Sequence, residues 1–378
     1  MPQALRFDQV ALPESEASLR DEVRQFLASA MPDDYLPDSD FNTGSSIEFS
    51  GQLGAAGYIG MTWPHAYGGG ERSFLERYIV TEELLAAGAP VGAHWIADRQ
   101  SGPLLLRFGT ESQRQRFLPG VARGEMFFSI GMSEPDTGSD LASISTSATR
   151  EEGGWRLNGT KIWTSNAHIN HYMITLVRTT PPTENRHAGM SQFIVDLKAP
   201  NVTVRGIDNI AGDSDFNQVF FDDVFVPDDQ VVGEPGNGWE QVISELGYER
   251  SGPERFLSAF RVLVEYTRLI GADPTPSEAA LLGRFVAHLA TLRSMSVSVA
   301  GMLEAGQAPN LEASLVKELG NNFEKMVPEL VRLAAPRGGS RRFVETLNQC
   351  ILHAPSFTLR GGTREILRGV IARGLGLR

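Results

Sequence analysis

The sequence contains a single cysteine, Cys350, among 378 residues. One cysteine excludes an intramolecular disulfide and a cysteine-rich metal site, and it suits a reducing compartment. The seven histidines include no His-Glu-x-x-His pair, so we expect no metal site. Neither Gly-x-Ser-x-Gly nor Gly-x-x-x-x-Gly-Lys-Ser/Thr occurs, which leaves serine-hydrolase and P-loop chemistry without support.

Positive charge is also scarce. Lysine and arginine number 34 against 46 aspartates and glutamates, which gives a net charge of −12. This is the wrong sign for general binding to a phosphate backbone, so we expect no nucleic-acid partner. The first ten residues lack the pattern of a signal or transit peptide, and we see no apolar run long enough to span a membrane. We therefore expect a cytoplasmic protein without a membrane partner.

Composition is otherwise that of a folded globular chain. Hydrophobic residues make up 41%, charged residues 21%, and glycine and proline number 39 and 21. These values exclude disordered, collagen-like and disulfide-stapled classes. The length suffices for two or three domains.

The spacing of apolar residues changes twice along the chain. Residues 14–128 show the three- and four-residue spacing of helices, residues from about 127 to 227 alternate as short strands do, and helical spacing returns after Gly238. The pattern predicts a helical region, then a small antiparallel barrel or sandwich, then a second helical region.

Two polar segments of the strand region are candidate ligand sites. Residues 133–140, Ser-Glu-Pro-Asp-Thr-Gly-Ser-Asp, form a turn whose hydroxyls and amides could hold a phosphate or the edge of a heterocycle, although a plain turn has the same composition. Residues 157–167 form a turn and a strand that present Trp163 and Ser165. A strand tryptophan usually packs in the core, so both interpretations of Trp163 stay open.

Glu249 is the candidate catalytic carboxylate. If one helix runs from Val242 to Phe260, Glu249 falls inside its apolar stripe, whereas Glu245 and Glu254 fall outside it and are expected to be solvated. Burial raises the pKa of a carboxyl group, which makes a glutamate a usable general base. The alternative is an inward ion pair with an arginine such as Arg250.

The residues after Glu249 lead to two further predictions. Pro253 removes the amide that would bond to the Glu249 carbonyl, so the helix should kink there. Gly252 and Pro253 should also leave room for a branched or bulky ligand beside the base.

Together these segments resemble the acyl-CoA dehydrogenase family from Arg24 nearly to the C-terminus. The family's order of domains implies an α+β fold with an N-terminal helical domain (1–126), a central antiparallel β-barrel (127–236) and a C-terminal four-helix bundle (237–378). The matching segments are Trp63-Pro64 with Tyr67-Gly-Gly69, residues 133–140, residues 158–165, Phe220 to Pro227, and Gly362-Thr-Arg-Glu-Ile366.

The resemblance implies FAD as cofactor, with an acyl-CoA as substrate and an electron-transferring flavoprotein as electron acceptor. The product would be the trans-α,β-enoyl thioester. The implied flavin contacts are Ile130, Met132, Ser133, Gly138, Ser139, Trp163, Ser165 and Thr363, and Ser139 and Arg250 would also lie near the substrate.

Most family members place the catalytic glutamate in a Glu-Gly-Thr string near the C-terminus. Here that string reads Gly361-Gly-Thr363, so the usual base is missing. A minority resembling isovaleryl-CoA and long-chain acyl-CoA dehydrogenases place it immediately before an arginine early in the bundle, which Glu249-Arg250 matches. The resemblance thus implies Glu249 as base and the amide of Gly361 as a contact to the thioester carbonyl.

The sequence also departs from the family. Family members usually carry an Arg-x-x-Phe-Gly string and a Gln-x-x-Gly-Gly string, and both reach the ADP half of the neighbouring subunit's FAD. In this sequence, residues 266–274 and 335–339 stand in their place and match neither string. Substitute contacts could come from Arg268 or Arg337 in a homo-oligomer, or from a paralogous partner in a hetero-oligomer. Two other functions stay open, a flavin monooxygenase on the same fold and a non-catalytic partner subunit; Glu249 argues against the first and the flavin motifs against the second.

Overall fold

The computed structural model divides into two compact units, each built from separate parts of the chain. The helical unit comprises Met1–Gly44, Arg72–Pro90 and Glu249–Arg378, and the sheet unit comprises Ser45–Glu71 and Val91–Tyr248. The structure describes residues 5–32, 35, 36, 44–181, 183–250, 252–335 and 338–377, and the side chains of residues 246–249 lie outside this description. The predicted order of helical, strand and helical regions is confirmed.

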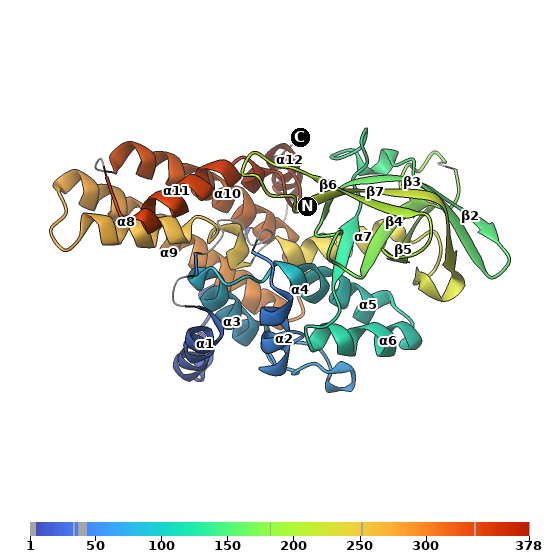
Figure 1. The fold of residues 1–378 in the computed structure, drawn as a ribbon, viewed down its shortest axis with the longest axis horizontal. Coiled ribbons are helices and arrows are strands. Elements are labelled where there is room, and N and C mark those ends of the chain that lie inside the picture. Colours follow the sequence, from blue (N-terminus) through green and yellow to red (C-terminus); the bar gives the residue numbers. More distant parts are fainter. Residues whose placement is uncertain are drawn as a thin grey trace. The chain divides into compact units, whose positions relative to one another are not determined.

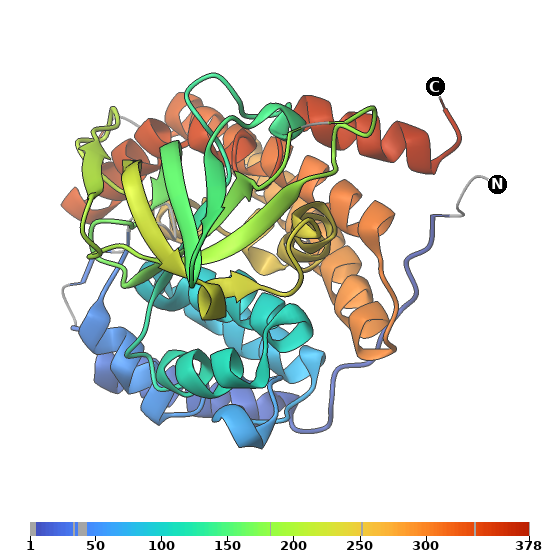
Figure 2. The same ribbon diagram turned by 90° about the vertical axis from the view of Figure 1, so that its right-hand side faces the viewer.

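The sheet unit contains eight strands in the order β6-β7-β3-β2-β4-β5-β8, with β1 paired to β4. Strands β2 to β7 are labelled in Figure 1, and Figure 2 shows the same sheet from another side. Their bounds are β1 Phe128–Gly131, β2 Ser147–Glu151, β3 Gly154–Ser165, β4 Tyr172–Arg178, β5 Met190–Asp196, β6 Val202–Ile207, β7 Phe216–Pro227 and β8 Val231–Val232.

The sheet is open and mixed, so the prediction of a closed antiparallel barrel is wrong. The strand path ends at β6 on one side and at the two-residue β8 on the other. Strand β1 runs parallel to β4, and β2 meets β4 in parallel at one pair, Ser147 and Arg178. Alternation along each strand indicates which side chains face a core, but it does not encode strand order or closure.

Side chains from most of the strands form the core of the sheet unit. Eleven of its fourteen members are valine, leucine, phenylalanine or tryptophan, as expected of strands that bury one face. The buried members are Ala148, Trp155, Leu157, Ala167, Met173, Val177, Phe193, Val195, Leu197, Val219, Phe221, Val224, Val226 and Val231.

Helices also belong to the sheet unit. They are α2 Ile47–Ala55, α4 Gly92–Ile96, α5 Gly102–Phe108, α6 Glu111–Ala122 and α7 Gly238–Glu249, of which α7 enters the helical unit at its last residue. A π-helical turn, η2 (Ala97–Ser101), joins α4 to α5. The short turns η1 His65–Tyr67, η3 Leu141–Ser143 and η4 Asp228–Gln230 complete the unit.

The helical unit joins two N-terminal helices to the C-terminal part of the chain. Its elements are α1 Glu16–Ala30, α3 Phe74–Ala87, η5 Pro253–Arg255, α8 Phe260–Ile270, α9 Pro276–Glu304, α10 Asn310–Ala334, α11 Arg341–His353, η6 Ser356–Thr358 and α12 Arg364–Gly374. Helix α3 packs against α1 and α9, and α10 packs against α8, α9, α11 and α12.

Helix α9 begins at a strong start signal. Thr275 and Glu278 form a capping box, and Pro276 occupies the first helical position. By length and composition alone α9 could cross a membrane, but a core helix of a folded protein passes the same test. Helix α9 packs against both α3 and α10, and 33% of its most apolar window is buried in the unit.

Candidate functional site

The predicted flavin residues of the sheet unit gather at the end of β1 and in the loop that follows. Ile130 lies in β1, and Met132 and Ser133 come directly after it, all three half-buried. The loop then forms a tight turn. The amide of Glu134 donates to the carbonyl of Thr137 at 2.7 Å, and the amide of Thr137 donates to the carbonyl of Glu134 at 3.0 Å. Gly138 and Ser139 follow the turn and are exposed. We call residues 132–146 the Ser133 loop.

A buried ion pair holds the Ser133 loop to β3. Lys161 Nζ lies 2.7 Å from Glu134 Oε1, and both side chains are almost completely buried. The same ammonium donates to the carbonyl of Met132 at 3.1 Å. Glu134 also accepts from the amide of Ser145 at 2.7 Å and from the amide of Thr146 at 2.9 Å. One lysine and one glutamate thus hold both ends of the loop.

The pair titrates far from the usual range of either residue. Burial alone would raise the pKa of Glu134, but Lys161 and the hydrogen bonds from Thr146 and Ser145 lower it to about 2. Burial lowers the pKa of Lys161 to about 8, against the attraction of Glu134. The carboxylate is therefore ionised throughout the physiological range.

Sequence reasoning missed this pair, although a signal exists. Lys161 stands two residues after Gly159 and four residues after Leu157. Leu157 is fully buried in the core of the sheet unit. Alternation along the strand therefore places Lys161 on the inward face, where a lysine needs an anionic partner.

Trp163 lies on the surface, so the interpretation that it packs in the core is wrong. Trp163 is 56% exposed, and its ring makes an edge-to-face contact with the ring of Phe216, with the centroids 6.2 Å apart. The β3–β7 register shifts between Lys161 and Thr164, and Thr164, instead of Trp163, is fully buried. Trp163 also has a φ of 59°, a region that bulky residues rarely occupy. An exposed indole on a strained backbone is a feature of a binding site.

Hydrogen bonds place Trp163 and Ser165 beside the Ser133 loop. The amide of Ile162 donates to the carbonyl of Ser133 at 2.9 Å. The hydroxyl of Ser129, on β1, donates to the carbonyl of Ser165 at 2.8 Å. An exposed aromatic face next to polar hydroxyls and amides fits a planar heterocycle with a polar edge, as a flavin is.

The remaining predicted residues lie in the helical unit. Arg250 is buried, and its Nε lies 3.4 Å from the carbonyl oxygen of Gly361. Gly361 and Gly362 have φ values of 63° and 96°, which favour glycine. Thr363 caps helix α12, since its hydroxyl accepts from the amide of Ile366 at 3.4 Å. The structure therefore brings Arg250, Gly361 and Thr363 together.

The side chain of Glu249 lies outside the described residues, so its role as base stays a prediction. The helix that carries it differs from the expected one. Helix α7 ends at Glu249, and Pro253 begins the separate turn η5. The expected kink at Glu249 is therefore a helix end, and the apolar stripe cannot be extended to Phe260.

The expectation that Glu245 and Glu254 are solvated is wrong for both. Glu245 is buried and accepts from Nε2 of Gln192, on β5, at 2.7 Å. Glu254 is 3% exposed, and its carboxylate lies where a side chain on Gly252 would stand. The expected room at Gly252 is thus filled by Glu254. The error at Glu254 follows from treating two helices as one, whereas Glu245 lies within α7, three residues after buried Val242 and on the same face of that helix.

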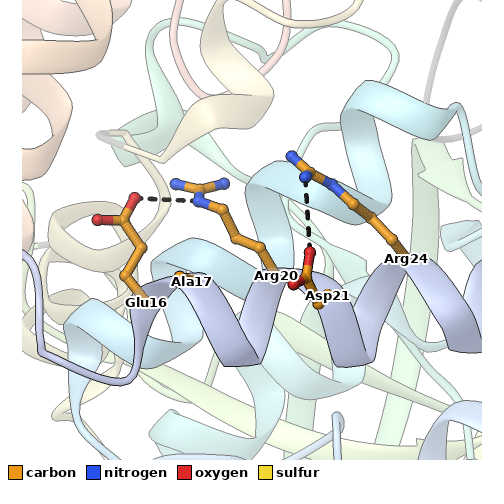
Figure 3. A pocket seen from close by; sticks show the side chains of 5 residues that line it. All are labelled: Glu16, Ala17, Arg20, Asp21 and Arg24. Atoms are coloured by element: carbon orange, nitrogen blue, oxygen red, sulfur yellow. Dashed lines mark hydrogen bonds and ion pairs between the residues drawn. The ribbon is translucent and has the colours of Figure 1, made fainter.

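A hollow of about 260 Å³ lies elsewhere, on the surface of α1 (Figure 3). It is lined by Glu16, Ala17, Arg20, Asp21 and Arg24. Its arginines already bind acidic residues, because Arg20 contacts Glu82 and Glu83 of α3 at 2.7 and 2.6 Å. The hollow contains none of the predicted site residues. In the described part of the chain, no group of three or more histidine, cysteine, aspartate or glutamate side chains could hold a metal.

Comparison with known proteins identifies the class. Sequence models of the acyl-CoA dehydrogenase N-terminal, middle and C-terminal domains match residues 13–125, 129–224 and 236–376. The chain is 34% identical over 334 residues to the acyl-CoA dehydrogenase IpdE1 of Mycobacterium tuberculosis, covering 86% of each protein. It is also 34% identical to acyl-CoA dehydrogenase FadE34 of that organism, of which it spans 45%.

Two solved structures are similar over nearly the whole chain. The Tcur3481-Tcur3483 steroid ACAD has a TM-score of 0.84 at 27% identity, covering 97% of this chain and 99% of that one. The ChsE4-ChsE5 complex from Mycobacterium tuberculosis has a TM-score of 0.82 at 28% identity, covering 98% and 100%. This chain therefore belongs to the acyl-CoA dehydrogenase family. It is an oxidoreductase enzyme.

Proposed function

We propose that the chain binds FAD and dehydrogenates an acyl-CoA to the trans-α,β-enoyl thioester, and that its electrons pass to an electron-transferring flavoprotein. The observation that carries this proposal is Trp163, whose ring is exposed on a strained backbone beside the Ser133 loop. Bound FAD would supply the acceptor for the hydride that leaves the β-carbon.

Three residues of the helical unit would act on the thioester. The carboxylate of Glu249 would take the proton from the α-carbon. The amide of Gly361 would donate to the thioester carbonyl, whose oxygen gains negative charge as that proton leaves. Arg250 would hold the Gly361 peptide through its carbonyl, at 3.4 Å.

The flavin content of the purified protein and its bleaching under anaerobic conditions test the proposal. We expect bound FAD, and loss of its visible absorbance on adding a suitable acyl-CoA but not on adding free coenzyme A. Bound flavin that no acyl-CoA bleaches, but that consumes oxygen with an external reductant, would favour the monooxygenase. Absence of flavin that persists when a paralogous partner and FAD are added would favour a non-catalytic subunit.

A second candidate is the flavin-bearing subunit of a hetero-oligomeric enzyme for bulky or steroid-like acyl-CoA. It is supported by the steroid ACAD and by the two-component ChsE4-ChsE5 complex among the similar structures. It is also supported by the altered segments 266–274 and 335–339, which would leave the ADP half of FAD without its usual contacts.

The helical unit also contains one of the two arginines that could replace the missing ADP contacts in a homo-oligomer. Arg268 is largely exposed and lies 2.5 Å from buried Glu265, which Arg342 of α11 approaches at 3.3 Å. Arg337, the other substitute considered, lies outside the described residues. Counting FAD per polypeptide separates the two assemblies. Stable homotetramers with close to one FAD per chain would exclude the mixed partner, whereas flavin-poor protein that gains FAD with a paralogue would support it.

A further inference from the structure

The described helical unit contains a buried polar layer that continues from the Gly361–Gly362 loop. Lys317, on α10, is fully buried and donates to the carbonyl of Gly362 at 3.0 Å. Asn321 stands one helical turn further along α10 and is also fully buried. We call Arg250, Glu254, Lys317 and Asn321 the polar layer.

The turn η5 packs closely on α10 at this layer. A side chain on Gly320 would collide with the carbonyl of Arg255, so the two backbones are in direct contact there. Glu254 belongs to that turn, and its carboxylate folds back over Gly252. Asn321 is the residue next to the point of contact. The backbone contact thus joins the residue after Glu254 to the residue before Asn321.

Two members of the layer lack partners among the described residues. Neither the Nδ2 nor the Oδ1 atom of Asn321 has a hydrogen-bond partner, and the Oε2 atom of Glu254 has none. Asn321 is 0% exposed and Glu254 is 3% exposed, so bulk water does not reach them freely. Because an unsatisfied buried amide or carboxylate is destabilising, these groups need a further partner, which a water molecule or a ligand can supply.

A saturated hydrocarbon chain cannot complete them. It has no donor for the carboxylate of Glu254 and neither donor nor acceptor for the amide of Asn321. A hydroxyl can donate to Glu254, and both a hydroxyl and a ketone can accept from Asn321. The layer also begins at the loop expected to hold the thioester, so it is placed to meet the acyl group.

We propose that Asn321 and Glu254 bind an oxygen function, a hydroxyl or a ketone, carried by the acyl group at a distance from the thioester. This inference rests on the proposed dehydrogenation. The enzyme would then discriminate against plain acyl chains, because these leave both side chains unpaired.

The test compares three thioesters, cyclohexylpropanoyl-CoA and the same compound carrying a ring hydroxyl or a ring ketone. The native enzyme should favour both oxygenated compounds in kcat/KM by at least roughly 100-fold, since a site built for a hydrogen bond rejects the analogue that lacks it. Equal kcat/KM for all three would mean that water satisfies these groups, and would overturn the proposal.

Four variants locate the effect. Asn321→Leu should abolish the preference and raise the Tm of the substrate-free protein, because it replaces an unsatisfied amide by an apolar group of similar size. Gly252→Ala should displace the Glu254 carboxylate and weaken the preference for the hydroxyl. Glu254→Gln, which supplies a donor, should favour the ketone over the hydroxyl. Lys325→Ala, at an exposed position of α10, is the control and should change none of these values. A preference that survives both Asn321→Leu and Gly252→Ala would contradict the assignment.

Calorimetry separates this inference from the proposed function. If the oxygenated thioester binds more tightly than the plain one and no thioester bleaches the flavin, recognition stands and dehydrogenation fails. If all three thioesters bleach the flavin equally, dehydrogenation stands and recognition fails.

Discussion

The Ser133 loop and the polar layer both bury charged groups, but only the first is complete in the chain itself. Glu134 has a cation and backbone amides around it. In the polar layer, Asn321 and one oxygen of Glu254 have no partner among the described residues. A complete site holds its geometry before a ligand arrives, whereas an incomplete one gains its last bonds from the ligand. The comparison fits the two roles proposed above, a rigid cofactor site at the Ser133 loop and a selective substrate site at the polar layer.

The largest effect should come from removing the base. Glu249→Gln should keep FAD and the fold but lower kcat by at least roughly 10²- to 10⁴-fold, because an amide cannot accept the α-proton. Flavin content and single-turnover bleaching measure the two properties separately. A variant that keeps most of its activity would remove Glu249 from the mechanism.

A glutamate at Gly361 in the Glu249→Gln background tests the geometry further. We expect partial recovery, because both positions serve the same α-carbon in the family. Recovery should be incomplete, since Gly361 has a φ of 63° and a side chain there is strained. No recovery at all would mean that the substrate lies differently here.

Breaking the ion pair should convert the complete site into an incomplete one. Lys161→Met leaves a buried carboxylate unpaired and should cost about 3–5 kcal/mol of unfolding free energy, with loss of FAD. Lys161→Met combined with Glu134→Leu removes both charges and should recover much of that stability. Chemical denaturation of the two variants measures this. Equal stability of the native and Lys161→Met proteins would contradict the role of the pair.

Buried His94 gives the sheet unit an acid-sensitive group. Burial lowers the pKa of His94 from 6.5 to about 4, and its Nδ1 lies 2.9 Å from the hydroxyl of Ser50. The unfolded chain binds this proton first, so stability should fall as the pH drops from about 6.5 to 4, by up to about 3 kcal/mol. Thermal unfolding across this range should show a smaller slope for His94→Gln. Exposed His65→Gln is the control.

The smallest expected effect concerns Trp163, and it distinguishes a flavin contact from a role in core packing. Trp163→Ala should weaken FAD binding about tenfold, since stacking of an aromatic side chain on a heterocycle is worth roughly 1–3 kcal/mol. The Tm of the flavin-free protein should hardly change, because the ring is 56% exposed. A large fall in that Tm with unchanged FAD affinity would return Trp163 to a structural role.

Much of the fold was predictable because it depends on local patterns. Spacing alone separated the helical from the strand regions, and the segments around Ser133 and Trp163 proved to be neighbours. Sheet closure was not predictable, since β1 pairs with β4 across more than forty residues. Burial of Glu254 was missed for a different reason. Its position follows from the break between α7 and α8, and a stripe calculated on one helix places it on the wrong face.

The interleaving of the two units has a consequence for synthesis of the protein. A ribosome releases the whole sheet unit once residue 248 has emerged, but α1 and α3 are made before the helices that complete their unit. The face of α3 that packs against α9 therefore stays uncovered while about two hundred further residues are added. Because nascent chains fold unit by unit from the N-terminus, this apolar face is where a chaperone would be needed.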